Sequence, residues 1–405
     1  MPTHDRYFSK LAIKIKASEI RELLALIRGR KDVISFAGGI PDPVLFPKKE
    51  LGELASKVVE IYGDHALQYS ETKGIIEVRE TIADFMAKRK NIKADPEDII
   101  ITTGSQQALD LISRVFIDPL DIVITENPTY LAALGAFKNV DARILGVKID
   151  DYGMKTDLLE DMLKNMSPEE RRRVKFIYVI PVAQNPAGVT MTRDRKKHLL
   201  EIASRYDLLV VEDDPYSYLV FEEGVDTASL KSLEKEGRVI YTSTVSKILA
   251  PGLRLGWVVA DKDIIRKIEM VKQYADLHSP TLNQFILAEA IKTGVVDRVI
   301  SRAIPHYKAK RDLMVKVMTE TFPDYTWYSR PVGGLFIFTY VYKESFYADV
   351  LLEKAINQYK VAYVPGGSFH TDGTGRNSMR ISFSYPTQEQ IVEGITRLAK
   401  LIIES

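Results

Sequence analysis

The chain has 405 residues, which exceeds the size at which one hydrophobic core usually stops growing, so two structural domains are expected. Hydrophobic residues make up 45% and charged residues 27%, as in ordinary globular proteins. The 56 basic and 55 acidic residues leave no global field for nucleic acid or an anionic membrane. The lack of cysteine excludes disulfides, thiolate metal sites and cysteine nucleophiles, and no metal site is predicted.

The N-terminal sequence indicates neither export nor membrane insertion. MPTHDRYFSK lacks the apolar core of a secretory signal, and no apolar run approaches the ~20 residues that cross a bilayer. We therefore expect a cytoplasmic protein with no membrane partner.

An amphipathic helix is predicted over residues 18–30, SEIRELLALIRGR. Its apolar residues from Ile20 to Ile27 recur at helical spacing, and Ser18 is a suitable N-cap. Binding to a membrane surface is the alternative function of such a helix, but its short length and mixed charges favour packing against the core.

From about residue 75 the sequence alternates between helical segments and short runs rich in Val and Ile. The predicted strands are residues 98–104, 121–128, 142–149, 174–182, 208–214, 238–245 and 255–260. This alternation predicts an α/β fold with a mainly parallel, seven-stranded sheet between helices. Ligands of such sheets bind beyond the carboxyl ends of the strands, so the polar residues that follow each run are the candidates for a site.

After about residue 290 the pattern changes to longer helices and fewer strands, which predicts a smaller α+β domain. The long polar helix is expected near residues 301–318, and a strand is expected near 378–385. Because the sheet begins only after the N-terminal segment, that segment is expected to pack with the C-terminal part. The predicted division is a large domain of residues 48–292 and a small domain of residues 1–47 and 293–405.

Three polar clusters at the predicted strand ends have a functional and a structural interpretation. Gly104 and Ser105 lie in a strand-to-helix turn whose free amides can bind phosphate, although Ser105 fits a plain N-cap equally well. Tyr130 follows a turn and can lie on a flat ligand, but buried tyrosines usually only pack. Asn185 lies in a segment dense in turn formers. This segment is either simply a tight turn or a turn that presents the Asn185 side chain as a hydrogen-bond donor at the end of the sheet.

Two further clusters carry charge. Three acids, Glu212, Asp213 and Asp214, end a buried strand, and an unpaired carboxylate there costs several kcal/mol or takes up a proton, so a cationic ligand would satisfy one of them. Lys247 lies among small hydroxyl residues at another strand end, seven positions before Arg254. Most lysines are solvated surface charges, but few stand in such surroundings.

The motifs NPTY, QNPAG, EDDPY, STVSK and GLRLGW, in this order and at these separations, resemble those of the fold-type I pyridoxal-phosphate (PLP) aminotransferases. The resemblance is greatest to the kynurenine/2-aminoadipate and archaeal aromatic aminotransferase group. It extends from AGGIPDP at residues 37–43 to NSMRISF at residues 377–383. Each motif alone is permissive, but five in register are specific.

The resemblance implies roles for individual residues. Lys247 forms an imine with the PLP aldehyde and moves the substrate α-proton, Asp213 pairs with the pyridine nitrogen, and Tyr130 stacks on the ring. The family pattern Asp-x-x-Tyr ends here at Tyr216, so Asp213 is chosen over its neighbours. Tyr216 and Asn185 are implied to bind the phenolic oxygen of PLP. The residues implied to hold the phosphate are Gly104, Ser105, Gln106, Thr244, Ser246 and Arg254.

The resemblance also implies substrate contacts and a homodimer. Arg380 matches the arginine that binds the substrate α-carboxylate, with Arg376 as a weaker competitor, and Gly39 lets the backbone approach the substrate. Tyr69 matches a tyrosine that reaches the phosphate of the neighbouring subunit, so each active site is expected to include both chains. Arg21 is hypothesised to bind the distal carboxylate of 2-oxoglutarate or 2-aminoadipate, and a solvent-facing arginine is the alternative.

The implied reaction is transfer of an amino group from an L-amino acid, aromatic, 2-aminoadipate or similar, to a 2-oxo acid such as 2-oxoglutarate. A PLP-dependent lyase or synthase uses the same cofactor residues and is the main alternative. A PLP-sensing regulator would carry an added DNA-binding module, for which the chain has neither the length nor a basic winged-helix segment.

Overall fold

The computed structural model describes residues 4–15, 17 and 19–405, and the predicted cap Ser18 lies outside them. The strands are β1 Ile34–Ser35, β2 Ile99–Thr102, β3 Ile122–Asn127, β4 Arg143–Asp150, β5 Gly153–Met154, β6 Val174–Val179, β7 Leu209–Asp214, β8 Val239–Thr244, β9 Gly256–Val259, β10 Thr326–Tyr328, β11 Phe336–Val341, β12 Val361–Ala362, β13 Val364–Pro365 and β14 Ser378–Ser382. The α-helices are α1 Lys10–Lys14, α2 Glu19–Leu26, α3 Lys48–Ala66, α4 Ile76–Lys90, α5 Ser105–Phe116, α6 Leu131–Asn139, α7 Thr156–Asn165, α8 Pro168–Arg172, α9 Arg193–Arg205, α10 Leu230–Leu233, α11 Lys262–Asp276, α12 Thr281–Lys292, α13 Val295–Thr321, α14 Ala348–Lys354 and α15 Gln388–Glu404.

The large sheet has the strand order β2-β9-β8-β7-β6-β3-β4-β5. Strands β8, β7, β6, β3 and β4 pair in parallel, whereas β9 is antiparallel to both of its neighbours. All seven predicted strands are present, and the mainly parallel α/β architecture is confirmed. The predicted count of seven is one too low, because β5 adds two residues antiparallel to β4 and is too short to show a periodicity.

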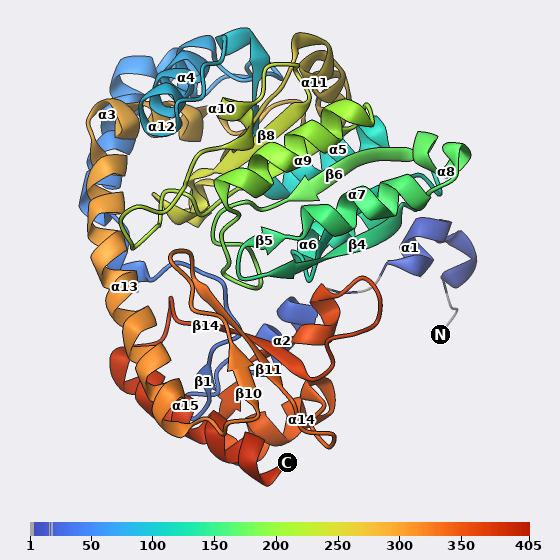
Figure 1. The fold of residues 1–405 in the computed structure, drawn as a ribbon. Coiled ribbons are helices and arrows are strands. Elements are labelled where there is room, and N and C mark those ends of the chain that lie inside the picture. Colours follow the sequence, from blue (N-terminus) through green and yellow to red (C-terminus); the bar gives the residue numbers. More distant parts are fainter. Residues whose placement is uncertain (1–3, 16, 18) are drawn as a thin grey trace.

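Helices cover both faces of this sheet because successive side chains of a strand point to opposite faces. On β3, Val123 belongs to the apolar cluster that contains Leu109 of α5 and Phe137 of α6. Its neighbour Ile124 belongs to a second cluster, which contains Leu199 of α9. Helices α7 and α9 lie on the near side of the sheet in Figure 1. Both faces of the strands are therefore apolar, and polar groups collect at the strand ends.

The C-terminal part contains a four-stranded sheet in the order β10-β11-β14-β13, with antiparallel pairing throughout. Strand β1 of the N-terminal segment joins this part, because Ile34 pairs in parallel with Val361 of β12, whereas Lys14 of α1 contacts Lys138 and Asp141 at the end of α6. Helix α13 runs along both parts of the molecule in Figure 1. We propose residues 48–292 as the large domain and residues 1–47 with 293–405 as the small domain.

The segment between β1 and α3 is anchored to α13 by a largely buried ion pair. The Asp42 carboxylate accepts hydrogen bonds from Lys310 Nζ at 2.6 Å and from His306 Nε2 at 2.9 Å. The Asp42 backbone N–H also donates to Tyr307 Oη at 2.9 Å. These contacts hold the chain three residues after Gly39, and so fix the backbone that enters the candidate site.

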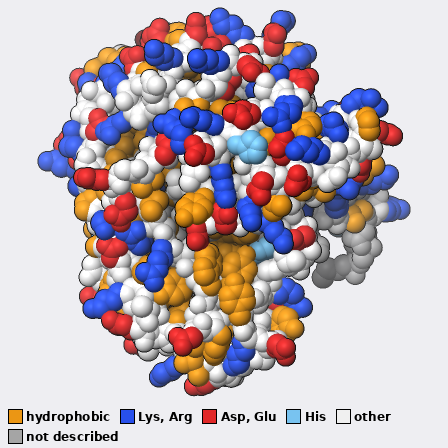
Figure 2. All heavy atoms as spheres, in the orientation of Figure 1, with side chains coloured by type: hydrophobic (Ala, Val, Ile, Leu, Met, Phe, Trp, Pro, Cys, Tyr) orange, Lys and Arg blue, Asp and Glu red, His pale blue; other side chains and the backbone are white. Residues whose placement is uncertain are grey.

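The visible surface carries mixed charges, and Figure 2 shows a cluster of hydrophobic side chains over the region of β10 and β11. Trp327 and Tyr340 lie there with ring centroids 5.8 Å apart, and Tyr342 stacks on Tyr340. Within the described part of the chain, no helix combines the length and the apolar character that a membrane span requires.

The Asp42 anchor yields a prediction about stability. Asp42→Ala leaves the Lys310 ammonium buried without its acidic partner, and we expect it to lower the free energy of unfolding by about 3 kcal/mol. Glu53→Ala removes an exposed pair with Lys49 and should change stability by less than about 1 kcal/mol. Urea unfolding of both variants measures the difference, and equal effects would contradict the anchoring role.

Candidate active site

Three consecutive acids end β7, and two of them are satisfied by the protein itself. Glu212 accepts a hydrogen bond from Ser229 Oγ at 2.7 Å and two more from backbone amides. Asp214 accepts from Ser217 Oγ at 2.6 Å and from Tyr241 Oη at 2.9 Å. Both carboxyl groups are buried and have structural partners, so neither is available to a ligand.

Asp213 differs from both neighbours. Its Oδ2 accepts one hydrogen bond, from Tyr178 Oη at 2.8 Å, and its Oδ1 is buried with no partner among the described residues. Burial raises the pKa of Asp213 to about 7, although the Tyr178 hydrogen bond acts in the opposite direction. A buried, unpartnered carboxylate oxygen fits a ligand that presents a positively charged N–H.

Lys247 follows β8 and lies beside the segment that contains Gly39. Its Nζ donates to the Gly39 carbonyl oxygen at 2.9 Å. Burial, with smaller effects from the charges of Arg380 and Arg254, lowers the pKa of Lys247 to about 8. More of the amine is therefore neutral near neutral pH than in a solvent-exposed lysine, which favours a nucleophilic role.

Arg380 lies on β14 and is the most buried cation of the site, with 2% of its surface exposed. It donates to Asn185 Oδ1 and to the Ala37 carbonyl, each at 3.0 Å, and its guanidinium lies 4.2 Å from the Phe336 ring centroid. Its Nε is buried without a partner, and its hydrogen bonds among the described residues reach no carboxylate. Burial lowers the pKa of Arg380 to about 10. A buried guanidinium without an acidic partner fits an anionic ligand.

Two tyrosines complete the walls of this cluster. Tyr216 is buried, packs edge-on against Phe336 with centroids 5.9 Å apart, and has its pKa raised chiefly by burial. Tyr130 caps the start of α6, and burial, reinforced by the charge of Asp213, raises its pKa. The Arg380 charge acts on both hydroxyl groups, so Tyr130 and Tyr216 belong to the same electrostatic environment.

The turn between β2 and α5 forms the second part of the site. Gly104 has a φ of +81°, and a Cβ atom there would lie 2.6 Å from Arg254 Nη2. Arg254 reaches across this turn to the Thr103 carbonyl. The glycine therefore permits a guanidinium to lie against the start of a helix, where free amides and the helix dipole attract anions.

The remaining residues predicted for the phosphate lie at or near this turn. Ser105 is the first residue of α5, and Gln106 is exposed and donates to the Ala132 carbonyl at 3.3 Å. Thr244 Oγ1 lies 2.9 Å from Ser246 Oγ, just before Lys247. A phosphate group fits this set of hydroxyl groups, helix amides and Arg254.

The remaining residues, predicted to contact the substrate or the neighbouring subunit, lie in different parts of the structure. A Cβ atom at Gly39 would lie 2.6 Å from the Phe336 ring, so glycine is required by close packing. Arg376 pairs with Asp349 at 2.8 Å, away from Arg380. Tyr69 is 78% exposed, and Arg21 is exposed on α2, although its charge lowers the pKa of Tyr130.

Sequence reasoning missed several residues that support the site. Tyr178 is the hydrogen-bond partner of Asp213, and a hydroxyl group within the apolar strand FIYV was its only signal. Gln184 is fully buried and joins two site loops, because its Nε2 donates to Glu126 Oε2 at 3.2 Å and to the Pro128 carbonyl at 2.8 Å. Burial raises the pKa of Glu126 to about 8. The sequence singles out Gly256 only as part of the GLRLGW motif.

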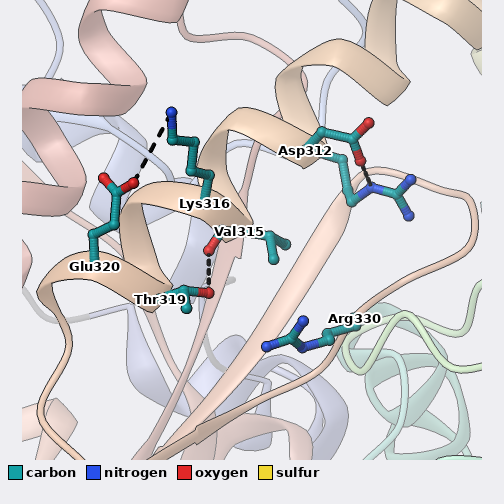
Figure 3. Close-up of a pocket in the computed structure, with 7 residues that line it drawn as sticks. Asp312, Val315, Lys316, Thr319, Glu320 and Arg330 are labelled. Atoms are coloured by element: carbon teal, nitrogen blue, oxygen red, sulfur yellow. Dashed lines mark hydrogen bonds and ion pairs between the residues drawn. The ribbon is translucent and has the colours of Figure 1, made fainter.

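Two cavities lie elsewhere. Figure 3 shows one of about 450 Å³ on α13, where Lys316 and Glu320 pair with each other and Arg330 projects from the opposite wall. The other, of about 720 Å³, lies between α2 and the loop before β14 and includes Glu19 and Glu22. None of the predicted cofactor residues lines either cavity.

The tight packing around Gly256 yields a prediction. A Cβ atom at this position would lie 2.8 Å from the Ser243 carbonyl oxygen and 2.9 Å from the Ser105 amide nitrogen, both backbone atoms. We expect Gly256→Ala to weaken PLP binding at least about tenfold and to lower the melting temperature, because the helix start must shift. Gly135→Ala in α6, where no atom lies within 4 Å, should leave PLP affinity unchanged. Equal affinities in both variants would contradict this role.

Comparison with known proteins places the chain in a family. The model of aminotransferase class I and II matches residues 49–398. The aromatic-amino-acid aminotransferase 1 of Thermococcus litoralis is 46% identical over 401 residues, covering 99% of this chain and 95% of the relative.

Two solved structures agree with this match. The kynurenine aminotransferase of Pyrococcus horikoshii, solved in complex with PMP, is 45% identical with a TM-score of 0.94, covering 99% of this chain and 98% of that one. The alpha-aminoadipate aminotransferase of Thermus thermophilus, complexed with N-(5'-phosphopyridoxyl)-L-leucine, is 38% identical with a TM-score of 0.89, covering 100% and 99%. The chain therefore belongs to the class I and II aminotransferases and depends on pyridoxal phosphate.

Proposed function

We propose that this aminotransferase moves amino groups from aromatic or 2-aminoadipate-like L-amino acids to 2-oxoglutarate, with Lys247, Asp213 and Arg380 at the centre of its site. The observation that carries the proposal is a group of three side chains: a partly buried lysine with a lowered pKa, and a buried arginine and a buried carboxylate oxygen that lack, respectively, an acidic partner and any partner within the part of the chain that the structure describes. Bound PLP supplies an aldehyde for amines and a ring that accepts electrons from the substrate α-carbon.

Lys247 is the proposed base and covalent anchor. Its amine reaches the Gly39 carbonyl, so it stands at the boundary between the two parts of the site. The positive charges of Arg380 and Arg254 and the burial of the amine all favour the neutral form. In that form the amine can take the α-proton from a substrate whose carboxylate is bound by Arg380.

Asp213, Asn185, Tyr216 and Tyr130 are proposed to orient and tune the cofactor ring. The free oxygen of Asp213 would accept a hydrogen bond from the protonated ring nitrogen, whose positive charge would keep the carboxylate ionised despite its burial. Asn185 and Tyr216 would donate to the phenolic oxygen, and Tyr130 would pack against the ring face. The proposed phosphate contacts are the α5 start at Gly104, Ser105 and Gln106, the hydroxyl groups of Thr244 and Ser246, and the Arg254 guanidinium.

Arg380 is proposed to bind the α-carboxylate that amino acids and 2-oxo acids share. Asn185 Oδ1 and the Ala37 carbonyl hold its two terminal nitrogens, so the guanidinium plane is fixed before a substrate arrives. The missing side chain of Gly39 lets the backbone lie close against the Phe336 ring, over which the Arg380 guanidinium packs. A pre-oriented arginine loses little freedom on binding.

The preference for dicarboxylic substrates is proposed to come from Arg21. Only Leu23 of α2 is buried, and the Glu19 and Glu22 side of the helix borders the larger cavity. The Arg21 charge nevertheless lowers the pKa of Tyr130 slightly, against the larger effect of burial, so Arg21 is within electrostatic range of this ring. The relative named for alpha-aminoadipate, a dicarboxylic amino acid, supports substrates of this kind.

A homodimer with shared active sites is also proposed. Leu67, Tyr69, Tyr274 and Leu277 are exposed, with 93% exposure for Tyr274. Tyr69 packs edge-on against His278. The segment that contains His278 also contacts the turn between β2 and α5, where Thr103 Oγ1 donates to the Asp276 carboxylate at 2.9 Å. An apolar patch beside the phosphate turn suits a subunit contact at which Tyr69 reaches the partner's site. The cytoplasmic location stays a prediction.

Lys247 can be identified chemically. Borohydride reduction of the PLP-loaded protein should fix the cofactor on Lys247, as detected by peptide mass spectrometry, and Lys247→Ala should abolish turnover. Because its pKa is about 8, the rate of cofactor capture should rise as the pH increases through that value, well below the ~10 of a free lysine. Lys90 and Lys196 are also buried with lowered pKa values and serve as internal controls. Label on either of them, or none at all, would contradict the assignment.

A panel of amino donors with 2-oxoglutarate, read by glutamate formation, tests the substrate proposal. We expect aromatic donors and 2-aminoadipate to be used with stoichiometric conversion, which a lyase would not give. Arg21→Ala should raise the Michaelis constants for 2-oxoglutarate and 2-aminoadipate about tenfold, the value of one charged hydrogen bond, and leave those of aromatic donors unchanged. Arg28→Ala, an exposed arginine just beyond α2, is the matched control. Unchanged constants in Arg21→Ala would refute its role.

A further inference from the structure

We propose that Tyr178 is a positioning residue whose hydroxyl group orients the Asp213 carboxylate, so that its second oxygen faces the ring nitrogen of the cofactor. The inference rests on the function proposed above for Asp213. It assigns a role to a residue of β6, the strand next to β7, that acts on the cofactor only through the Asp213 side chain.

The strand register places the two side chains together. Strands β6 and β7 are parallel neighbours, and Tyr178 is opposite Val211. Because side chains alternate along a strand, Val211 and Asp213 point to the same face of the sheet. The Tyr178 ring extends along this face to the strand end, where its Oη lies 2.8 Å from Asp213 Oδ2.

The hydrogen bond makes the two carboxylate oxygens different. A free carboxylate can rotate and exchange its oxygens, whereas Tyr178 holds Oδ2 and leaves Oδ1 buried, with no partner in residues 4–15, 17 and 19–405. A hydroxyl donor also stabilises the charged form of Asp213, against the effect of burial on its pKa. Both effects prepare Asp213 for a protonated ring nitrogen.

The Tyr178 ring is held independently of its hydroxyl group. The side chain is fully buried, and its ring lies edge-on to Phe137 with centroids 5.4 Å apart. Phe137 belongs to α6, the helix that begins directly after Tyr130. Tyr178→Phe therefore keeps the packing that supports the cofactor wall and removes the hydrogen bond alone.

The chain contains a matched control on the next strand. Tyr241 of β8 is equally buried, and its Oη donates to Asp214 Oδ2 at 2.9 Å. Tyr241→Phe removes the same type of bond from an acid of the same strand end. Asp214 keeps the two hydrogen bonds from Ser217, so this acid stays satisfied and no cofactor role is assigned to it.

The experiment measures the dissociation constants of two cofactors. PLP is compared with 1-deazapyridoxal 5'-phosphate, in which a C–H group replaces the ring nitrogen, using equilibrium titration of the cofactor-free wild type, Tyr178→Phe and Tyr241→Phe. We expect Tyr178→Phe to weaken PLP about tenfold, the value of one hydrogen bond to a charged group, and to leave the deaza analogue unaffected. Tyr241→Phe should leave the ratio of the two constants unchanged.

The pH dependence of the visible absorption band gives a second readout. In Tyr178→Phe the Asp213 carboxylate loses its donor, so its pKa should rise and the ring nitrogen should be less completely protonated. We therefore expect the midpoint of the spectral titration to shift in Tyr178→Phe and to keep its wild-type value in Tyr241→Phe. A merely structural role for Tyr178 would change protein stability without this selective spectral shift.

Two results would overturn the inference. One is an unchanged ratio of the two dissociation constants in Tyr178→Phe, whether both cofactors bind equally more weakly or neither changes. The other is a Tyr178→Phe chain that fails to fold, which would show that the hydroxyl group serves the fold. Asp213→Asn separates this inference from the function on which it rests. If Asp213→Asn abolishes the discrimination between the two cofactors and Tyr178→Phe does not, only the Tyr178 role is wrong. If neither variant affects it, the assignment of Asp213 to the ring nitrogen is wrong as well.

Discussion

Buried charge without a counter-charge is the constraint on which the site depends. Among the described residues, one Asp213 carboxylate oxygen has no partner and Arg380 forms no hydrogen bond to an acid, while Lys247 bonds a carbonyl oxygen. Each arrangement is costly for the protein alone, because charges and polar groups lose solvation on burial. A ligand with a protonated ring nitrogen, an aldehyde and, from the substrate, a carboxylate satisfies all three. The unfavourable electrostatics of the free protein are thus the basis of its recognition chemistry.

The fold brings these groups together by joining distant parts of the chain. Asp213 and Lys247 end adjacent parallel strands of the large sheet, whereas Arg380 comes from β14 of the small one. The hydrogen bond between Arg380 and Asn185 links residues 195 positions apart. The segment that contains Gly39 lies between them, held by the pairing of β1 with β12 and by the Asp42 anchor on α13. The substrate side of the site therefore depends on how the two sheets are held relative to each other.

The end of β7 shows how one acid is kept available while its neighbours are not. Glu212 and Asp214 are saturated by hydroxyl and amide donors, so they stabilise the loops after the strand. Asp213 receives a single hydrogen bond, from Tyr178. The difference lies in the number of donors within reach, because all three acids are equally buried. The hydrogen bonds of Glu212 and Asp214 make this strand end rigid, while the remaining acceptor of Asp213 can bind a cation.

The sequence by itself determined the seven main strands, because Val- and Ile-rich runs followed by turn residues have few other stable arrangements, and the spacing of its motifs determined the family. It also placed Asp213 and Lys247 at strand ends, where parallel sheets bind ligands. Only the tertiary structure decided which groups these residues meet. Tyr178 donates a hydrogen bond to Asp213, and Gly256 lies so close to the Ser105 amide that a Cβ atom would meet it. Neither neighbour can be predicted from where these residues stand in the sequence. Local sequence fixes backbone preference and burial, whereas the partners of a buried polar group depend on which strands become neighbours.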